Sequence, residues 1–332
     1  MKTVYYIILL LNIFAMAACS NQGEAATTSM PSSTPEVEAT ELHAFDADSA
    51  YSYVKAQVDM GPRVPGTEAH DRCAKYLAQK LEEFGADSII MQQGTVTAFD
   101  GTKLPITNIS ARFNSAKPDA KSIVLLAHYD TRPWADEDPD PDNRNTPIDG
   151  ANDGASGVGV LLEVARQIGL ERPGVNVEIF FTDAEDYGSS DGMSEDSWCL
   201  GTQYYLDSNP YSDGAPAYGV LLDMVGGKGA TFYREQFSEL YAKPINDKVW
   251  AQAKRAGLSS RFVDRIGGAI TDDHLHFIKS RIPVIDIIEM NNVATGSFPP
   301  YWHTLGDNMD NIDRGTLGDV GSVVTNLIYS EK

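Results

Sequence analysis

The stretch that decides the fold is VNVEIFFTDAED, residues 175–186. It begins as a mostly apolar run, which is typical of a strand covered on both faces. It then ends in three carboxylates, Asp183, Glu185 and Asp186, with no Lys or Arg anywhere in residues 175–190. Like charges this close repel one another, and burial raises the cost. Either water solvates the three acids, or a positive ion that the sequence does not encode lies among them.

Other segments repeat this alternation of buried strand and helix. Buried strands are predicted at 122–130, 175–182, 217–224 and 282–288, and helices at 67–85, 154–169, 236–256, 273–279 and 314–329. An antiparallel pair, 89–99 and 107–113, is predicted earlier in the chain, with Asp100-Gly101 as its turn. The pattern predicts one α/β domain with a mixed, mostly parallel central sheet and helices on both faces.

The N-terminus has the layout of an export signal. Lys2 precedes a short apolar run, and the small residues of MAAC end at Cys19, as in a bacterial lipoprotein cleavage box. We therefore expect a signal peptide at 1–18, a lipidated Cys19 with a flexible tether over 19–41, and a catalytic domain over 42–332. An ordinary cleaved signal is the alternative. The protein is expected to be exported, as a periplasmic or outer-membrane-attached lipoprotein.

Composition limits the partners. The net charge of −21 over 332 residues argues against nucleic acid and against attraction to anionic lipid, so the only membrane contact expected is the lipid anchor. Such a surface suits cationic ligands, including peptides with free amino termini, although solubility explains it equally well. Cys73 and Cys199 are expected to be unpaired small hydrophobes, with a disulfide as the alternative. A monomer is expected.

Candidate site residues gather where apolar strands end. His128, Asp130 and Asp223 occupy such positions, as do the acids of the opening stretch, and ligands of open α/β sheets bind outside these ends. An Asp beside a His commonly orients it for a metal, although a core histidine bonded to its neighbour is the alternative. Asp153, in GANDGASG, lies where a helix should begin, so it could be a ligand or a helix cap.

The segment FPPYWHT supplies the last candidate. His303 is one of only six histidines and follows two prolines and two aromatic residues. A set of carboxylates and imidazoles without Cys suits a catalytic zinc ion with an open coordination position. A dication would neutralise the acids, and the free carboxylate of the Glu185–Asp186 pair would become a base beside it. A solvated acidic loop, in a non-enzymatic lipoprotein stabilised by calcium, is the minor alternative.

Taken together, the ordered motifs HYD, GANDGASG, FFTDAEDYG, LLDM, DDH and WHT resemble the zinc aminopeptidase and glutaminyl cyclase superfamily over residues 44–330. TDDHLHF and FPPYWHT resemble its glutaminyl cyclase branch, and the stretch from DTRP to IDGANDGASG looks bacterial in type. The resemblance implies one zinc ion held by Asp153, Asp186 and His303. It also implies a Glu185 proton shuttle, a hydrogen-bonded acid pair and an aromatic pocket wall. The pair is Asp223 with Asp272, and the wall is Trp302 with Phe298.

The sequence departs from the family pattern in three places. Asp186 is shorter than the Glu usual at that ligand position, Thr271 stands where animal cyclases have Gln, and an insertion around 290–296 precedes Phe298. The implied reaction is zinc-dependent cyclisation of the N-terminal glutamine of peptides or proteins to pyroglutamate, with release of ammonia. A zinc aminopeptidase is the alternative, because His128 and Asp223 also fill the positions that a second zinc ion would use.

Overall fold

The computed structural model describes residues 43–191 and 195–331. The predicted signal peptide, Cys19 and tether lie outside the described residues. Within the described part of the chain, no helix is both long and apolar enough to cross a membrane.

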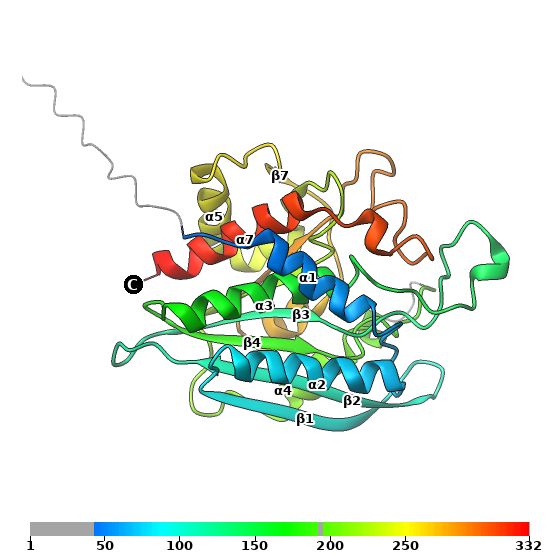
Figure 1. The fold of residues 1–332 in the computed structure, drawn as a ribbon, viewed down its shortest axis with the longest axis horizontal. Helices are drawn as coiled ribbons and strands as arrows, with labels where there is room; N and C mark the ends of the chain where they lie inside the picture. Colours follow the sequence, from blue (N-terminus) through cyan, green and yellow to red (C-terminus); the bar gives the residue numbers. More distant parts are fainter. Residues whose placement is uncertain (1–42, 192–194, 332) are drawn as a thin grey trace, which may run out of the picture. The chain divides into compact units, whose positions relative to one another are not determined.

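A six-stranded sheet forms the centre of the domain, in the order β1-β2-β4-β3-β5-β8 (Figure 1). Its strands are β1 (Ser88–Thr97), β2 (Lys103–Phe113), β3 (Ser122–His128), β4 (Asn176–Thr182), β5 (Tyr218–Asp223) and β8 (Val284–Ile288). β1 and β2 form an antiparallel pair, and β2 joins β4 antiparallel. β4, β3, β5 and β8 run parallel to one another. The predicted mixed, mostly parallel sheet is confirmed.

The turn between the first two strands follows from local chemistry. Gly101 has a φ of +87°, and Ala98 exchanges backbone hydrogen bonds with the residues across the turn. Glycine adopts this left-handed backbone without steric cost, as the Asp-Gly pair predicted.

Helices cover both faces of the sheet. One face carries α1 (Ala47–Val58), α2 (Glu68–Glu83), α3 (Ala155–Leu170), α5 (Gln236–Arg255) and α7 (Arg314–Ser330), and the other carries α4 (Leu200–Asp207) and α6 (Asp273–Lys279). Successive residues of a central strand point to opposite faces of the sheet, so they pack in two different cores. Leu125 and Ile179 pack in the larger core with α1, α3 and α7, while Leu126 and Phe180 pack in the smaller core with α4 and α6.

Three helices differ from the sequence prediction, and one of them is α4, which was not predicted. α1 was not predicted, although Asp46 caps it by accepting from the backbone N–H groups of Asp48 and Ser49. The predicted helix at 236–256 is broken at Ala242, whose φ of −134° is not helical, two residues before Pro244. Proline lacks an N–H and displaces the preceding turn, so α5 is two helical pieces.

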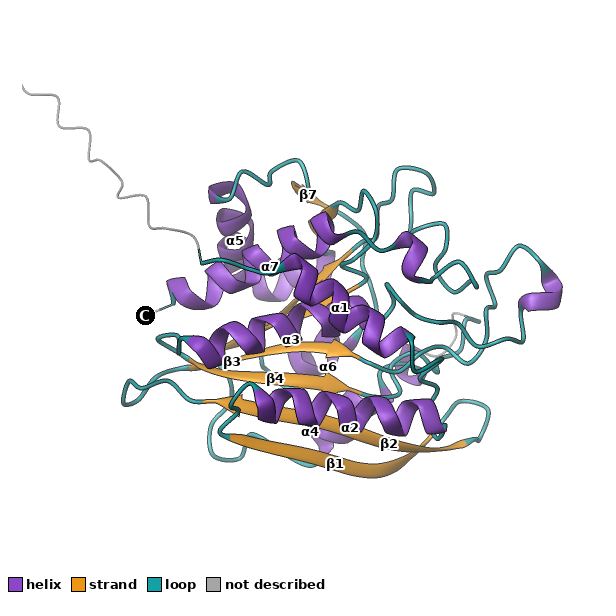
Figure 2. Cartoon of the chain, viewed as in Figure 1, coloured by secondary structure: helices purple, strands orange, loops and turns teal. Residues whose placement is uncertain are grey.

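The loops after the parallel strands gather at one end of the sheet, beyond the strand tips (Figure 2). A separate pair, β6 (Phe232–Arg234) and β7 (Phe262–Ile266), lies outside the main sheet. The collected loops carry nearly all of the candidate site residues.

Candidate active site

Three side chains from distant parts of the chain converge beyond the strand tips. Ligand atoms of Asp153, Asp186 and His303 all lie within 4.8 Å of one another, and all three residues are buried. His303 Nε2 is 3.1 Å from Asp186 Oδ1 and 3.5 Å from Asp153 Oδ2. The structure thus brings together the three residues for which the sequence resemblance implied a metal.

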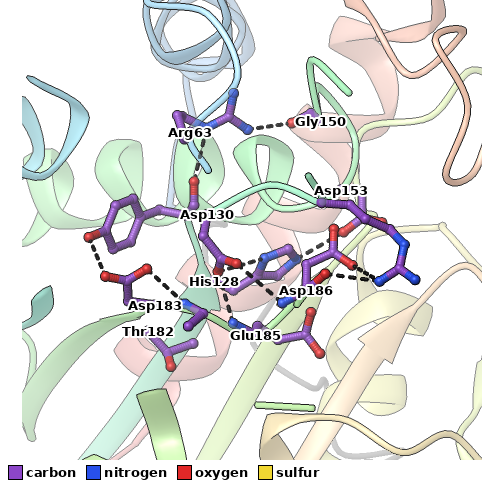
Figure 3. Close-up of polar contacts among 12 residues, drawn as sticks. Arg63, His128, Asp130, Gly150, Asp153, Thr182, Asp183, Glu185 and Asp186 are labelled. Carbon is purple, nitrogen blue, oxygen red and sulfur yellow. Dashed lines mark hydrogen bonds and ion pairs between the residues drawn. The ribbon is translucent and has the colours of Figure 1, made fainter. Parts of the chain in front are cut away.

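Asp153 is held in place through its backbone. Asp307 accepts the backbone N–H groups of Asn152 and Asp153 at 2.8 and 3.1 Å. The buried guanidinium of Arg63 donates to the carbonyls of Tyr129 and Gly150, so it ties this loop to the end of β3 (Figure 3). The alternative role of Asp153 as a helix cap is wrong, because Gly154 occupies that position and no side chain caps α3.

Asp186 and its neighbour Glu185 are held by Asp130. The Asp130 carboxylate accepts the backbone N–H of Glu185 at 3.0 Å and that of Asp186 at 3.2 Å (Figure 3). Asp130 Oδ1 is 3.6 Å from His128 Nδ1, so its hydrogen bonds fix the acidic loop rather than the imidazole. The loop also has an αL residue, Ala184, with a φ of +48°.

Aromatic rings enclose His303. Trp302 stacks on its imidazole with ring centroids 3.6 Å apart, and Trp198 lies nearly parallel to it at 6.2 Å. The backbone of His303 is left-handed, with a φ of +52°. Its Nδ1 lies 3.5 Å from Asp136, a residue of the acidic loop after β3. The rings and this carboxylate together restrict the imidazole to one orientation.

Asp183 does not belong to the converging cluster. His70 Nε2 lies 2.8 Å from its Oδ2, and both the Tyr129 hydroxyl and the Thr107 backbone N–H donate to it. The expectation that one dication neutralises all three acids of the opening stretch is therefore wrong for Asp183. Its partner is instead a histidine 113 residues away. Burial opposes the charged form of His70, but the Asp183 carboxylate raises the pKa of His70 above its usual value.

The cluster forms the floor of a cavity of about 270 Å³. Apolar and aromatic side chains build its walls, namely Trp198, Met224, Ala269, Ile270, Ile288, Phe298 and Trp302. Both predicted wall residues, Trp302 and Phe298, are among them, and Thr271 also lines the cavity. Met290, the first residue of the predicted insertion, packs with Trp302 and Phe298 behind this wall.

A second group of acids lines the same cavity beside the cluster. Burial, together with the nearby charges of Asp272 and Asp186, raises the pKa of Glu185 well above its usual value. Burial and the Asp223 charge do the same for the pKa of Asp272. Asp272 also accepts the Asp273 backbone N–H, and its implied pairing with Asp223 stays a prediction.

The Glu185 side chain accepts a weak hydrogen bond from a cysteine. The Cys199 thiol donates to Glu185 Oε1 at 3.4 Å, and Cys199 is free, as is Cys73. The expectation of unpaired cysteines is confirmed. The thiol is a weak donor, so Glu185 keeps acceptor capacity toward the cavity.

His128 contacts one acid of the cluster and one acid of the second group. Its Nε2 is 3.0 Å from Asp153 Oδ1 and 3.2 Å from Asp223 Oδ1, and these three residues form a second set with metal-ligand spacing. Although burial alone would raise the pKa of Asp153, the side chains of His128 and His303 lower it below its usual value.

The residues of the first set fit a divalent metal ion. Two carboxylates and one imidazole match the donors that zinc accepts in catalytic sites. Asp186 Oδ2 is buried without a hydrogen-bond partner, which a buried carboxylate oxygen seldom tolerates. A cation among the three side chains would satisfy this oxygen and offset the repulsion between the two acids.

Sequence reasoning missed the residues that hold the ligands. Asp307 lies 154 positions from Asp153, and Arg63 lies 87 positions from Gly150, so no local pattern links them. Arg132 and Asp136 lie in the stretch from DTRP to IDGANDGASG, whose pattern indicates a bacterial type but does not indicate that these residues hold the ligands. The one usable signal is an arginine two residues after the HYD motif, since an arginine buried there would require a carboxylate or carbonyl partner.

The fold and site together define a class, an exopeptidase-like α/β enzyme with a carboxylate and imidazole cluster at the strand tips. Residues 108–328 match the model of peptidase family M28. The chain belongs to peptidase family M28, in the branch of the bacterial glutaminyl cyclases.

Relatives of both activities appear. A glutaminyl cyclase from Bacteroides thetaiotaomicron, solved with N-acetylhistamine, is 51% identical with a TM-score of 0.83, covering 88% of this chain and 100% of its own. A Zn-dependent exopeptidase from Parabacteroides distasonis is 49% identical with a TM-score of 0.83 and the same coverage. The glutaminyl-peptide cyclotransferase of Bos taurus is 26% identical over 302 residues, 79% of this chain and 76% of its own.

Proposed function

We propose that this chain converts the N-terminal glutamine of peptides and proteins to pyroglutamate and releases ammonia. The supporting observation is a free carboxylate, Glu185, at the floor of a cavity walled by Trp302, Phe298 and other apolar side chains. Such walls exclude water, which favours attack by the substrate's own amine over hydrolysis. The similarity to enzymes also argues against a non-enzymatic lipoprotein.

One zinc ion is proposed as the cofactor, with Asp153, Asp186 and His303 as its ligands. When bound, zinc supplies Lewis-acid polarisation of the γ-carbonyl group of the substrate glutamine.

Glu185 moves the proton in this proposal. A bond forms between the α-nitrogen and the γ-amide carbon, and the bond from that carbon to the amide nitrogen breaks. Glu185 accepts a proton from the attacking amine and returns it to the departing nitrogen, which leaves as ammonia. Its raised pKa suits this exchange, because a carboxyl that titrates nearer neutrality both accepts and donates readily.

Asp223 and Asp272 are proposed to act as a pair that shares a proton. The charge of Asp223 contributes to the raised pKa of Asp272, so the two acids disfavour simultaneous ionisation. In this state the ionised acid accepts a hydrogen bond from the substrate amine, and the protonated acid can donate a hydrogen bond.

The test is to incubate the purified protein with a glutamine-initiated peptide, and to measure ammonia and peptide mass. We expect one ammonia per peptide, no freed amino acid, and no reaction with the same peptide begun by alanine. Glu185→Gln should slow the release by about 10³-fold. A freed N-terminal residue would instead establish the aminopeptidase.

The aminopeptidase remains the second candidate because the set of His128, Asp153 and Asp223 offers a second metal position. Metal analysis separates the two functions. One tightly bound zinc ion per chain is expected for the cyclase, and two would support the peptidase.

We also propose that the enzyme is a monomer exported as a lipoprotein anchored at Cys19, acting on exported peptides and proteins. Cys19→Ala should release the protein from the membrane fraction of the producing cell. Membrane retention in that variant would contradict the lipid anchor.

A further inference from the structure

A buried arginine lies directly behind two of the proposed metal ligands. Arg132 follows β3, and its side chain is only 1% exposed. Its guanidinium lies between two indole rings, 5.0 Å from Trp134 and 4.9 Å from Trp198. A cation removed from water this completely requires full hydrogen bonding to be stable.

One edge of the guanidinium fixes the loop that carries Asp186. Nη1 donates to the backbone carbonyls of Asp186 at 3.0 Å and of Gly188 at 3.3 Å. The same nitrogen lies 3.6 Å from Asp186 Oδ1. Asp130 already holds the N–H of Asp186, so both sides of this residue's backbone are anchored by buried side chains.

The other edge reaches His303 through Asp136. Nε and Nη2 donate to the two Asp136 oxygens at 2.7 Å each, a bidentate pair. Asp136 Oδ1 in turn lies 3.5 Å from His303 Nδ1, an atom that has no closer polar partner among the described residues. Trp198, stacked against Arg132, also faces the His303 ring.

We infer that Arg132 and Asp136 form one positioning unit that sets the metal affinity of the site by fixing Asp186 and His303 relative to each other. This inference rests on the proposed zinc site. The unit explains how Asp186, which is shorter than the glutamate usual at this ligand position, can hold the ion. An aspartate reaches less far than a glutamate, so its backbone must be placed closer to the ion and held there. Two anchors on the backbone of Asp186 do this.

The charge of Arg132 should weaken zinc binding, whereas its positioning of Asp186 and His303 should strengthen zinc binding. The test must therefore separate the two effects. The guanidinium alone repels a cation, but its bidentate partner cancels most of that field. The double variant Arg132→Gln with Asp136→Asn removes the unit and leaves the net charge unchanged. Its matched control is Arg261→Gln with Asp319→Asn, which removes an ion pair of 2.5 Å that is not part of the site.

Zinc affinity is measured by competition with a chromophoric chelator, with thermal unfolding of each zinc-loaded variant as the check on folding. We expect the double variant to bind zinc about 10- to 100-fold more weakly, as the loss of a residue that orients a ligand usually causes. The control pair should change zinc affinity less than about twofold, since it contacts no ligand. Excess zinc should restore most of the turnover, because the catalytic groups remain in place.

Two single variants complete the test. Asp136→Asn, whose parent side chain is 25% exposed, should also weaken zinc binding, because it removes the carboxylate beside His303 and leaves the guanidinium charge uncancelled; thermal unfolding checks its fold. Arg132→Lys should also bind zinc more weakly than wild type, because an ammonium group cannot form the bidentate pair with Asp136.

The outcomes distinguish this inference from the proposed function. A folded double variant with wild-type zinc affinity overturns the positioning unit and leaves the function untouched. A wild-type protein that binds no zinc overturns both the unit and the proposed metal, while the ammonia assay still decides whether the chain is a cyclase.

Discussion

The two halves of the cavity floor use similar residues in opposite charge environments. Asp153 and Asp186 form one half with His303, and Arg132 lies behind them. Glu185, Asp223 and Asp272 form the other half, where His128 contacts Asp223. Histidine neighbours lower the pKa of Asp153, whereas burial and neighbouring acids raise those of Glu185 and Asp272.

The comparison teaches that one cavity can prepare carboxylates for two tasks. Acids beside fixed positive charge stay ionised and suit a metal cation. Acids without such charge retain protons toward neutral pH and suit proton transfer. Asp186 is intermediate, since burial and the Asp153 charge raise its pKa to about 6, so it is still mostly ionised at neutral pH. The division between a metal half and a proton half can be tested by substitution.

The largest effect is expected from the proton half. Glu185→Gln removes the only carboxylate proposed to move the proton, and general acid–base catalysis usually contributes about 10²- to 10⁴-fold. We expect turnover to fall by about 10³-fold while zinc content stays unchanged, as measured by ammonia release and metal analysis. A variant that keeps turnover within tenfold of wild type would contradict the assigned role.

A direct comparison of the halves comes from two aspartates that both contact His128. Asp153→Asn should lose zinc, because it removes a ligand charge from the metal half. Asp223→Asn should keep zinc yet slow turnover by about 10²-fold, because it alters proton sharing. Metal content and ammonia release are measured on both variants. Equal zinc loss in the two would break the division and favour a two-metal site.

Asp183, which comes from the same acidic stretch but lies outside both halves, should matter for stability alone. His70→Ala leaves its buried carboxylate unpaired, which typically costs about 3–5 kcal/mol in the free energy of unfolding. Urea unfolding measures this loss, with Lys55→Ala, an exposed ion-pair residue, as a control expected to cost at most about 1 kcal/mol. Loss of zinc binding in folded His70→Ala would place Asp183 in the metal site after all.

The smallest effect is a pH dependence. Burial is the main reason that the pKa of Asp273 is raised to about 7, so the folded state keeps a proton that the unfolded chain loses at about pH 4. The contribution of Asp273 to the free energy of unfolding therefore falls as pH rises from about 4 to about 7, by at most about 1.4 kcal/mol per pH unit.

Asp273→Asn removes this dependence, so the metal-free variant should lose less stability than metal-free wild type between about pH 4 and about pH 7. Urea unfolding at the two pH values, in the presence of chelator, measures the difference. Parallel pH profiles for the two proteins would show that Asp273 is not protonated in the folded state.

Much of the architecture follows from the sequence because buried parallel strands have a simple signature. The run before Asp183 and the run before His128 are apolar on both faces, and each ends in polar side chains. Chain topology then places the ends of neighbouring parallel strands together. This reasoning placed Asp186 at the common end of the strands, whereas the resemblance to the family, rather than topology, implied that Asp153 and His303 lie beside it.

What could not be predicted depends on contacts between distant segments. The sequence does not reveal that Asp183 faces His70 rather than the cavity, because adjacent carboxylates on a loop can point in any direction. The bracing by Arg63, Arg132 and Asp307 is equally nonlocal. α1 was missed because its apolar residues are sparse, so that packing against α3 and α7 rather than periodicity fixes it.

The left-handed backbone at the site has a consequence for engineering. Among the described residues, seven non-glycine residues have positive φ, and two of them, Met224 and His303, line the cavity. Each such conformation costs about 1–3 kcal/mol, which the packed surroundings must supply. Consensus or glycine substitutions chosen to raise thermal resistance would relax these positions first and shift the groups beside them. A heat-tolerant derivative should therefore be sought in the helices remote from the strand tips.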